Sequence, residues 1–284
     1  MTNQPHLTLR LLLAFLAFAV TVIALITLSP TLFKWSVSEE RFINAPQKLL
    51  VVFAHTDDEV TNSGLIHYLA SQGTEITLLT LTDGSANPRS DLGACTDGET
   101  ITDCRMREVR SAAKLMGIKH VETPLLPDSK LMEHLPQAVQ AVSAELIKTK
   151  PEAILTMEPS GLNGLADHRA AFASVAKAVT GSVQKPIILL STLPWPISFF
   201  LPTEISTELR HKRRVFHTKN GLRRVKISVA EAHKSQASTI NGLTLGLGPD
   251  RLFKWIDFET YSIHESDDLP FLQAKKSQKR NDAD

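Results

Sequence analysis

Residues 48–59 read K-L-L-V-V-F-A-H-T-D-D-E, an apolar run that passes directly into a histidine and three acidic residues. The run at 48–54 is rich in β-forming side chains and shows no polar alternation, which predicts a strand buried on both faces, as in a parallel sheet. Ionisable side chains that follow a buried strand are costly to place without a partner. The stretch therefore predicts a buried strand, with a metal ion as the natural partner of the polar groups at its end.

Strands and helices alternate along the chain after this stretch. Apolar runs predict further strands at 75–81, 120–126, 153–157 and 186–191, and helical spacing predicts helices at 60–72, 103–116, 133–149 and 167–180. Gly117 is the expected stop of the second helix. The order predicts an α/β fold, a Rossmann-like parallel sheet with helices on both faces. After Trp195 the pattern loosens, and no second domain is expected.

The composition is that of a globular protein. Hydrophobic residues make up 43% of the 284 residues and charged residues 21%, which excludes a disordered or fibrous chain over most of the length. Lys and Arg total 31 against 30 for Asp and Glu, so there is no basic excess of the kind that nucleic-acid binders show. The basic run at 210–214 is interpreted as a solvated face. A nucleotide-binding α/β protein is excluded because no glycine-rich loop follows the first strand.

The N-terminal part contains a candidate membrane segment. Residues 11–28 carry no charge, and 18 helical residues would span about 27 Å, close to the hydrocarbon core of a bilayer. A buried helix would show a polar stripe, and a cleaved signal peptide usually has a shorter apolar core. The segment is therefore predicted to be a transmembrane signal anchor. The expected organisation is a tail at 1–10, the anchor at 11–28, a linker at 29–47, one domain at 48–274 and a charged tail at 275–284.

Cys95 and Cys104 flank a short polar loop, and their spacing suits either a disulfide or two unrelated thiols. Disulfides persist in oxidising compartments. Basic residues are nearly level on the two sides of residues 11–28, so the orientation rests on the cysteines. We expect an N-terminus inside and a domain outside the cytoplasm.

The polar groups after the strands suit a catalytic metal site. His55 and Asp58 are three residues apart in a turn and can converge on one ion, while Asp57 can point at a water molecule. Catalytic zinc typically takes three protein ligands and leaves a fourth position open, and iron would also tolerate this donor set. His168 opens the helix that follows the fourth strand. Alone it would be interpreted as a helix cap or a surface residue, but together with H-x-D-D-E it is the predicted third ligand.

The stretch A-H-T-D-D-E at 54–59 resembles the A-H-P-D-D-E signature of the LmbE-like, or PIG-L, family of zinc-dependent N-acetylglucosamine deacetylases. Further motifs follow in family order. They are L-T-D-G at 81–84, R-x-x-E at 105–108, L-M-G at 115–117, L-P-D at 126–128, G-x-x-G-x-x-D-H at 161–168 and A-H-x-S-Q at 232–236. The resemblance covers residues 48–237.

The resemblance implies one zinc ion per chain, with Fe²⁺ as the other possible metal. Its implied ligands are His55, Asp58 and His168, and the implied general base is Asp57. The expected activity is hydrolysis of the N-acetyl group of an N-acetylglucosamine-containing glycan or glycolipid, on a substrate that the anchor suggests is lipid-linked.

The resemblance also implies sugar contacts at Arg105 and Asp128. The alternatives are an ion pair of Arg105 with Glu108 on the helix surface, and a turn cap for Asp128. His233 matches the A-H-x-S-Q motif without an assigned role, and a packing or hydrogen-bonding residue is the simpler interpretation.

The sequence departs from the family pattern at Thr56 and Leu165. Thr56 replaces a proline from which only backbone shape is expected. Leu165 replaces the first histidine of H-x-D-H, which is thought to donate a proton or stabilise the oxyanion, and the loss of one such group typically costs about 10²–10⁴ in rate. The chain is thus expected to be a slower deacetylase or one with a substitute acid, for which His233 is a candidate. The alternative is a catalytically impaired metal-binding protein that acts as a carbohydrate-binding or accessory protein on the same fold.

Overall fold

The computed structural model describes residues 21, 45–86, 92–193, 213–219, 221–244 and 246–269. The chain divides into two units, Met1–Val37 and Ser38–Asp284, and the fold described below is that of the second unit. Apart from residue 21, the predicted anchor at 11–28 lies outside the described residues, as do the tails at 1–10 and 275–284 and most of the linker at 29–47. Every helix within the described ranges is too short or too polar to cross a membrane.

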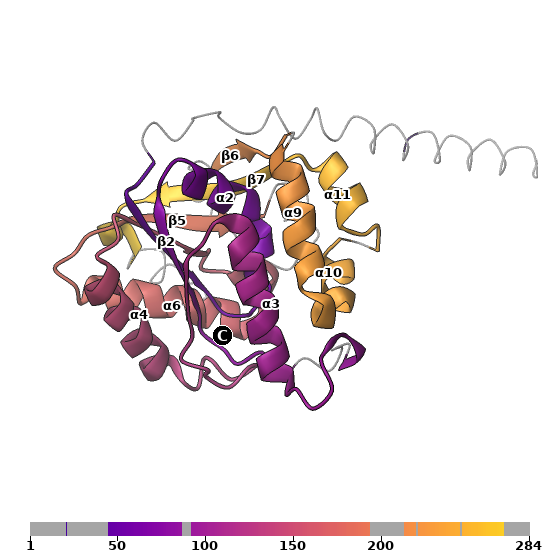
Figure 1. Cartoon of the computed structure of the whole chain (residues 1–284). Helices are drawn as coiled ribbons and strands as arrows, with labels where there is room; N and C mark the ends of the chain where they lie inside the picture. Colours follow the sequence, from indigo (N-terminus) through magenta and orange to yellow (C-terminus); the bar gives the residue numbers. More distant parts are fainter. Residues whose placement is uncertain are drawn as a thin grey trace, which may run out of the picture. The chain divides into compact units, whose positions relative to one another are not determined.

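One sheet of seven strands organises the described part of the second unit (Figure 1). The strands are β1 (Lys48–Phe53), β2 (Glu75–Thr80), β3 (His120–Glu122), β4 (Ala153–Met157), β5 (Ile187–Thr192), β6 (Arg213–His217) and β7 (Phe258–His264), in the spatial order β3-β2-β1-β4-β5-β7-β6. The first five strands pair in parallel, which confirms the predicted α/β core.

The prediction of a wholly parallel sheet is wrong at one edge. β7 pairs antiparallel with both β5 and β6, so the sheet is mixed. β7 reads F-E-T-Y-S-I-H, and most of its residues are buried although several are polar. Hydrogen bonds stabilise these buried polar side chains. Thr260 Oγ1, for example, donates to the carbonyl of Thr192 at 2.5 Å. A strand of this composition gives no apolar run, which is why the sequence after Trp195 looks loosely patterned.

Helices cover both faces of the sheet, as predicted. They are α2 (Ser63–Ser71), α3 (Ile101–Met116), α4 (Leu135–Thr149), α5 (Gly161–Gly164), α6 (Ala166–Thr180), α9 (Gly221–Ala232), α10 (Ala237–Leu243) and α11 (Pro249–Trp255). α4 and α6 pack on one face, and α2, α3 and α9 on the other (Figure 1). β1 supplies both cores, because Leu49, Val51 and Phe53 face the α3 side while alternate residues face α4 and α6.

The predicted boundaries hold best where a capping residue marks them. α3 begins after Thr100, whose side chain accepts a hydrogen bond from the Asp103 N–H at 3.1 Å, and it ends at Gly117 in the left-handed conformation (φ 83°). The strand predicted at 120–126 is shorter, because β3 ends at Glu122 and the chain rejoins the sheet only in a single bridge between Leu126 and Thr82.

The strand order places a topological switch point beside β1. β1 pairs with β2 on one side and with β4 on the other, so the connections leave β1 and β4 in opposite directions. In open α/β sheets, ligands bind beyond the carboxyl ends of the strands at such a switch point. The H-T-D-D-E turn follows β1, and α5 and α6 follow β4 at this same edge.

Candidate metal centre

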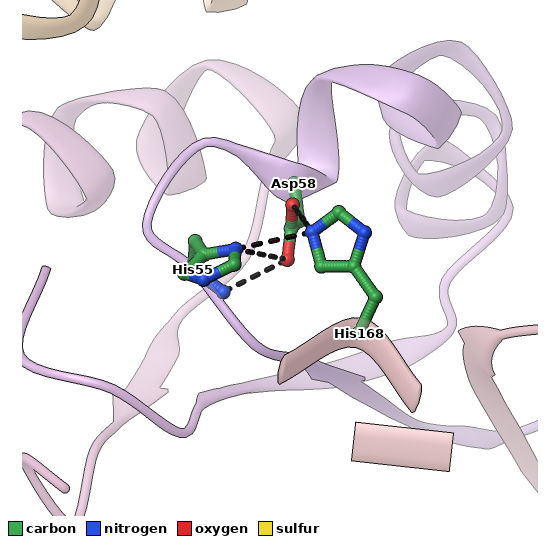
Figure 2. Close-up of side chains that lie close together, drawn as sticks. All are labelled: His55, Asp58 and His168. Atoms are coloured by element: carbon green, nitrogen blue, oxygen red, sulfur yellow. Dashed lines mark hydrogen bonds and ion pairs between the residues drawn. The ribbon is translucent and has the colours of Figure 1, made fainter. Parts of the chain in front are cut away.

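Three side chains converge at the switch point, and we call His55, Asp58 and His168 the metal centre (Figure 2). His55 Nδ1 lies 3.1 Å from His168 Nε2, which in turn lies 3.0 Å from Asp58 Oδ1. His55 Nδ1 is 3.6 Å from Asp58 Oδ2. The structure thus brings together all three ligands that the sequence predicted.

The turn after β1 folds so that its first and fourth residues face each other. The His55 N–H donates to Asp58 Oδ2 at 2.8 Å, which holds the carboxylate beside the imidazole of its own turn. Asp58 then opens the 3₁₀ helix η1 (Asp58–Asn62), which leads into α2. The spacing H-x-x-D is therefore sufficient to place two donors on one side of the turn.

Hydrogen bonds on the outer nitrogens orient both imidazoles. His168 Nδ1 donates to the Gly161 carbonyl at 3.0 Å, which leaves the Nε2 lone pair toward the centre. His55 Nε2 lies 3.4 Å from Asp128 Oδ1 and 3.5 Å from Asp167 Oδ2, so a proton on Nε2 leaves Nδ1 free for a cation.

The donor set fits zinc. Two nitrogens bonded to one zinc ion at about 2.0–2.1 Å lie roughly 3.3 Å apart in tetrahedral geometry. The 3.1 Å between the imidazole nitrogens and the 3.0 Å to the carboxylate oxygen are close to that spacing. If both imidazoles are neutral with these lone pairs facing each other, they repel unless a cation lies between the two nitrogens; without a metal, a proton shared between them has the same effect. A second group of donors shares His55, namely Asp128 and Asp167 on its Nε2 side.

The charges of the metal centre favour a bound cation. Burial alone would raise the pKa of the Asp58 carboxyl, but the imidazoles of His168 and His55 bring that pKa far below its usual range. Burial alone would lower the pKa of His55, yet Asp58, with hydrogen bonds to Asp128 and Asp167, raises it well above its usual value. Asp58 likewise raises the pKa of His168 against the effect of burial. Metal binding must therefore displace protons from these imidazoles.

Asp57, the predicted base, lies in the same turn and is 7% exposed. Burial raises the pKa of its carboxyl, and the neighbouring charge of Asp58 raises it further, while His233, His55 and Arg105 act in the opposite direction. A carboxylate with a raised pKa is a stronger proton acceptor than an exposed one. Among the described residues the grouped donor atoms do not include Asp57, and its role as general base stays a prediction.

Arg105 and Asp128, the predicted sugar contacts, lie next to the centre. Arg105 is 1% exposed, and its Nη1 donates to the Gly84 carbonyl and lies 3.9 Å from Asp128 Oδ2. Gly84 has φ +67°, and a Cβ there would come within 2.9 Å of Arg105 Cδ, so the arginine requires a glycine at this turn. Asp128 accepts from the Ala86 N–H at 3.0 Å besides facing His55. Glu108, the alternative partner considered for Arg105, accepts hydrogen bonds from Ser235.

Leu165 lies at the N-cap of α6, three residues before His168, and its apolar side chain is 48% exposed. Two residues further, Asp167 is buried and accepts from the Ser129 and Leu131 N–H groups at 2.7 and 3.1 Å. Asp167 also faces His55 Nε2, a role that its sequence pattern did not predict. Its place directly before His168 in a motif was the available signal.

His233 and Thr56 are both buried inside the domain. His233 is 0% exposed, and its Nε2–H donates to Glu59 Oε1 at 2.6 Å. The hydrogen-bonding interpretation of His233 agrees with this geometry, whereas its burial and its bond to Glu59 do not favour a role as the substitute acid. Thr56 Oγ1 accepts from Gln236 Nε2 at 3.1 Å, so the side chain does more than set backbone shape.

Cys95 and Cys104 form a disulfide, with Cα atoms 5.5 Å apart. The sequence left two free thiols as the alternative, and the structure favours the bonded form. Because Cys104 directly precedes Arg105 in α3, the disulfide ties the preceding loop to the helix that carries this arginine.

Comparison with known proteins now identifies the fold around this centre. Residues 50–179 match the sequence profile described as PIG-L: GlcNAc-PI de-N-acetylase. These residues form a PIG-L, or LmbE-like, domain. The match runs from β1 to the end of α6 and includes all three residues of the metal centre.

Two curated relatives align with about half of the chain. A probable N-acetyl-alpha-D-glucosaminyl L-malate deacetylase 2 of Bacillus cereus is 30% identical over 145 residues, which is 49% of this chain and 65% of the relative. A 1D-myo-inositol 2-acetamido-2-deoxy-alpha-D-glucopyranoside deacetylase of Rhodococcus erythropolis is 29% identical over 155 residues, 47% of this chain and 53% of the relative. The chain thus spans less than two thirds of either relative.

The PIG-L domain also resembles solved structures in its fold. The zinc-inhibited form of teicoplanin deacetylase superposes with a TM-score of 0.59 at 16% identity, covering 78% of this chain and 99% of that one. At this identity the likeness concerns the fold alone. The superposition covers more of the chain than residues 50–179.

Gly161 supports His168 by its backbone, and we predict that alanine at this position weakens metal binding at least tenfold. Gly161 has φ +73°, which costs an alanine about 1–2 kcal/mol, and a Cβ there would lie 2.9 Å from His168 Cβ. Loss of a hydrogen bond that orients a metal ligand typically costs about 10–100-fold in metal affinity, and we expect a loss in that range here. The measurement is a zinc competition titration. Gly181→Ala is the control, because a Cβ at Gly181 meets only ordinary contacts at 3.7 Å; equal affinity of both variants would contradict the prediction.

Proposed function

We propose that this protein is a metal-dependent deacetylase that hydrolyses the N-acetyl group of an N-acetylglucosamine-containing substrate, with zinc as the metal and Fe²⁺ as the alternative. The observation that carries the proposal is the convergence of the three donors of the metal centre beside Asp57 inside a PIG-L domain. The names of the curated relatives support an amino-sugar amide as the substrate class.

The divalent cation would be held by His55, Asp58 and His168, where it supplies a Lewis acid for the amide carbonyl and lowers the pKa of a water molecule to about 7. Asp57 accepts a proton from the water whose oxygen attacks the acetyl carbon. The C–N bond then breaks, and Asp57 returns the proton to the amine nitrogen. The products are the free amine and acetate.

The other polar residues hold these groups in place. Asp128 and Asp167 keep His55 in the orientation that presents Nδ1, and Gly161 does the same for His168 Nε2. We propose that Arg105, anchored by Gly84, and Asp128 bind the hydroxyl groups of the sugar. Arg105 is buried, so this contact requires the sugar to reach below the surface beside the metal centre.

Leu165 is the position where the proposal is most sharply tested. A leucine cannot protonate the developing oxyanion, and we predict that Leu165→His raises kcat by up to about 10²-fold, the usual contribution of one general acid. Leu165→Asn is the matched control, since it adds polarity without a titrating imidazole. The measurement is kcat for acetate release at saturating substrate. A kcat that stays flat or falls in Leu165→His would show that another group already serves as the donor.

The second candidate function is a metal-binding carbohydrate-binding or accessory protein without catalysis, and Leu165 is the observation that favours it. The complete donor set and Asp57 favour the hydrolase. One experiment separates the two: metal analysis together with acetate release from N-acetylglucosaminyl malate, N-acetylglucosaminyl inositol and chitooligosaccharides. The hydrolase releases acetate from at least one of them in a metal-dependent manner. Metal-loaded protein that binds the sugars and releases none supports the accessory protein.

We also propose that residues 11–28 anchor the protein in a membrane, with the domain outside the cytoplasm and a lipid-linked or envelope glycan as substrate. The uncharged run of 18 residues supports an anchor, and the Cys95–Cys104 disulfide supports an oxidising compartment. Alkaline extraction of native membranes should leave the protein in the pellet, with both thiols blocked under non-reducing alkylation. Release into the supernatant with two free thiols would point to a cytoplasmic protein.

A further inference from the structure

The A-H-K-S-Q segment at 232–236 is the motif to which the proposed function assigns no role. It spans the end of α9 and the 3₁₀ helix η3 (Lys234–Gln236). His233, Ser235 and Gln236 are buried, whereas Lys234 between them is exposed. Each of these three buried residues forms a hydrogen bond with a different residue, either in the turn after β1 or in α3.

Two of these bonds flank the catalytic aspartates. Gln236 Nε2 donates to Thr56 Oγ1 at 3.1 Å, directly before Asp57. His233 Nε2 lies 2.6 Å from Glu59 Oε1, directly after Asp58. The turn that carries Asp57 and Asp58 is thus held on both sides by one short segment that lies 174 and 180 residues further along the chain.

The third bond reaches the arginine helix. Glu108 accepts from the Ser235 N–H at 2.8 Å and from Ser235 Oγ at 2.7 Å. Glu108 lies three residues after Arg105 in α3, about one helical turn away. The same segment therefore links the turn of the proposed base to the helix of the proposed sugar contact.

Asp57 is the N-cap of η1, but within the described residues its side chain makes no capping hydrogen bond to the turn that carries it. A misplacement of about 1 Å in a reacting group can cost 10²-fold in rate. Thr56 stands where the family signature has proline, so this chain has exchanged a rigid ring for a hydroxyl that Gln236 can bond.

We propose that the 232–236 segment positions the two halves of the active site: His233 and Gln236 fix the Asp57 turn through Glu59 and Thr56, and Ser235 fixes α3 and hence Arg105 through Glu108. The proposal rests on the proposed function. These are positioning residues, since each acts through another side chain. A role in general stability would affect both halves alike, whereas positioning predicts different kinetic effects for the two.

The test compares kcat and KM of metal-loaded variants. Thr56→Val keeps the shape of the side chain and removes the acceptor for Gln236, and we expect kcat to fall about tenfold with KM and metal content unchanged. His233→Ala should lower kcat by about 10–100-fold, and His233→Gln, which retains an N–H donor toward Glu59, should recover most of it. Ser235→Ala should instead raise KM about tenfold with a smaller change in kcat. Lys234→Ala is the control within the same segment and should match the parent.

The outcomes are separable. If His233→Ala does not fold, Thr56→Val and Ser235→Ala still give the contrast between kcat and KM. Variants that lose activity only in proportion to folded, metal-loaded protein overturn the positioning role, as do variants that all keep the parent constants. If the parent releases no acetate from any substrate, the proposed function fails and this proposal fails with it; an active parent with unaffected variants overturns the positioning role alone.

Discussion

Asparagine at position 57 is expected to lower the rate of acetate release by about 10²–10⁴-fold, the range that one general acid–base group contributes. The amide matches the carboxyl in size but cannot accept the proton of the attacking water. The donors of the metal centre come from His55, Asp58 and His168, so the variant should keep about one equivalent of metal. The measurements are kcat per bound metal ion and elemental analysis of the same sample.

Asp97→Asn is the matched control for this substitution. Asp97 is exposed in the loop between the bonded cysteines, so its replacement changes the same group and the same net charge away from the site. It should retain the parent kcat. An Asp57→Asn protein with the parent rate would remove the general base from the proposal, and one that lost its metal would place Asp57 in the coordination of the ion.

The predictable part of the fold is the part whose strands are buried on both faces. β1 after Lys48 and β4 apart from Thr156 are apolar because helices cover both sides, so their sequences identify them without reference to other strands. β7 lies in the same sheet but contains Glu259, whose carboxylate accepts from the Gly64 and Leu65 N–H groups at 2.9 and 2.8 Å. Such a strand is stabilised by partners far away in the sequence, and its own residues do not reveal it.

The same distinction separates the predicted from the missed site residues. His55 and Asp58 belong to one turn after a recognisable strand, so local spacing was enough to pair them. Asp167 acquires its role from the backbone of residues 36 and 38 positions earlier, and Thr56 from a glutamine 180 positions later. Comparison of Thr56 with the proline of the family signature predicted a role in backbone shape alone. Its hydrogen bond could not be predicted, because only the fold brings Gln236 close to it.

Removal of the His168 imidazole is expected to have the other large effect, reducing bound zinc from about one equivalent to less than about a tenth after dialysis, since a three-ligand site loses one of its two nitrogen donors. His168 Nε2 lies within 3.1 Å of the donor atoms of His55 and Asp58, with no room for a water molecule between it and these atoms. The measurement is elemental analysis of His168→Ala. The control is His120→Ala, which removes an exposed imidazole from β3 and should leave the metal content unchanged.

This experiment also decides on which side of His55 the ion binds. The alternative donors Asp128 and Asp167 face His55 Nε2, opposite to the metal centre at Nδ1. If the ion binds at Nδ1, Asp167→Asn should retain most of the metal, because the amide oxygen can still accept the His55 and Ser129 N–H groups, and only the Leu131 N–H loses its acceptor. If His168→Ala kept its zinc while Asp167→Asn lost it, the ion would belong to the Nε2 side. The hydrogen bond from His168 Nδ1 to Gly161, which directs Nε2 inward, favours the first result.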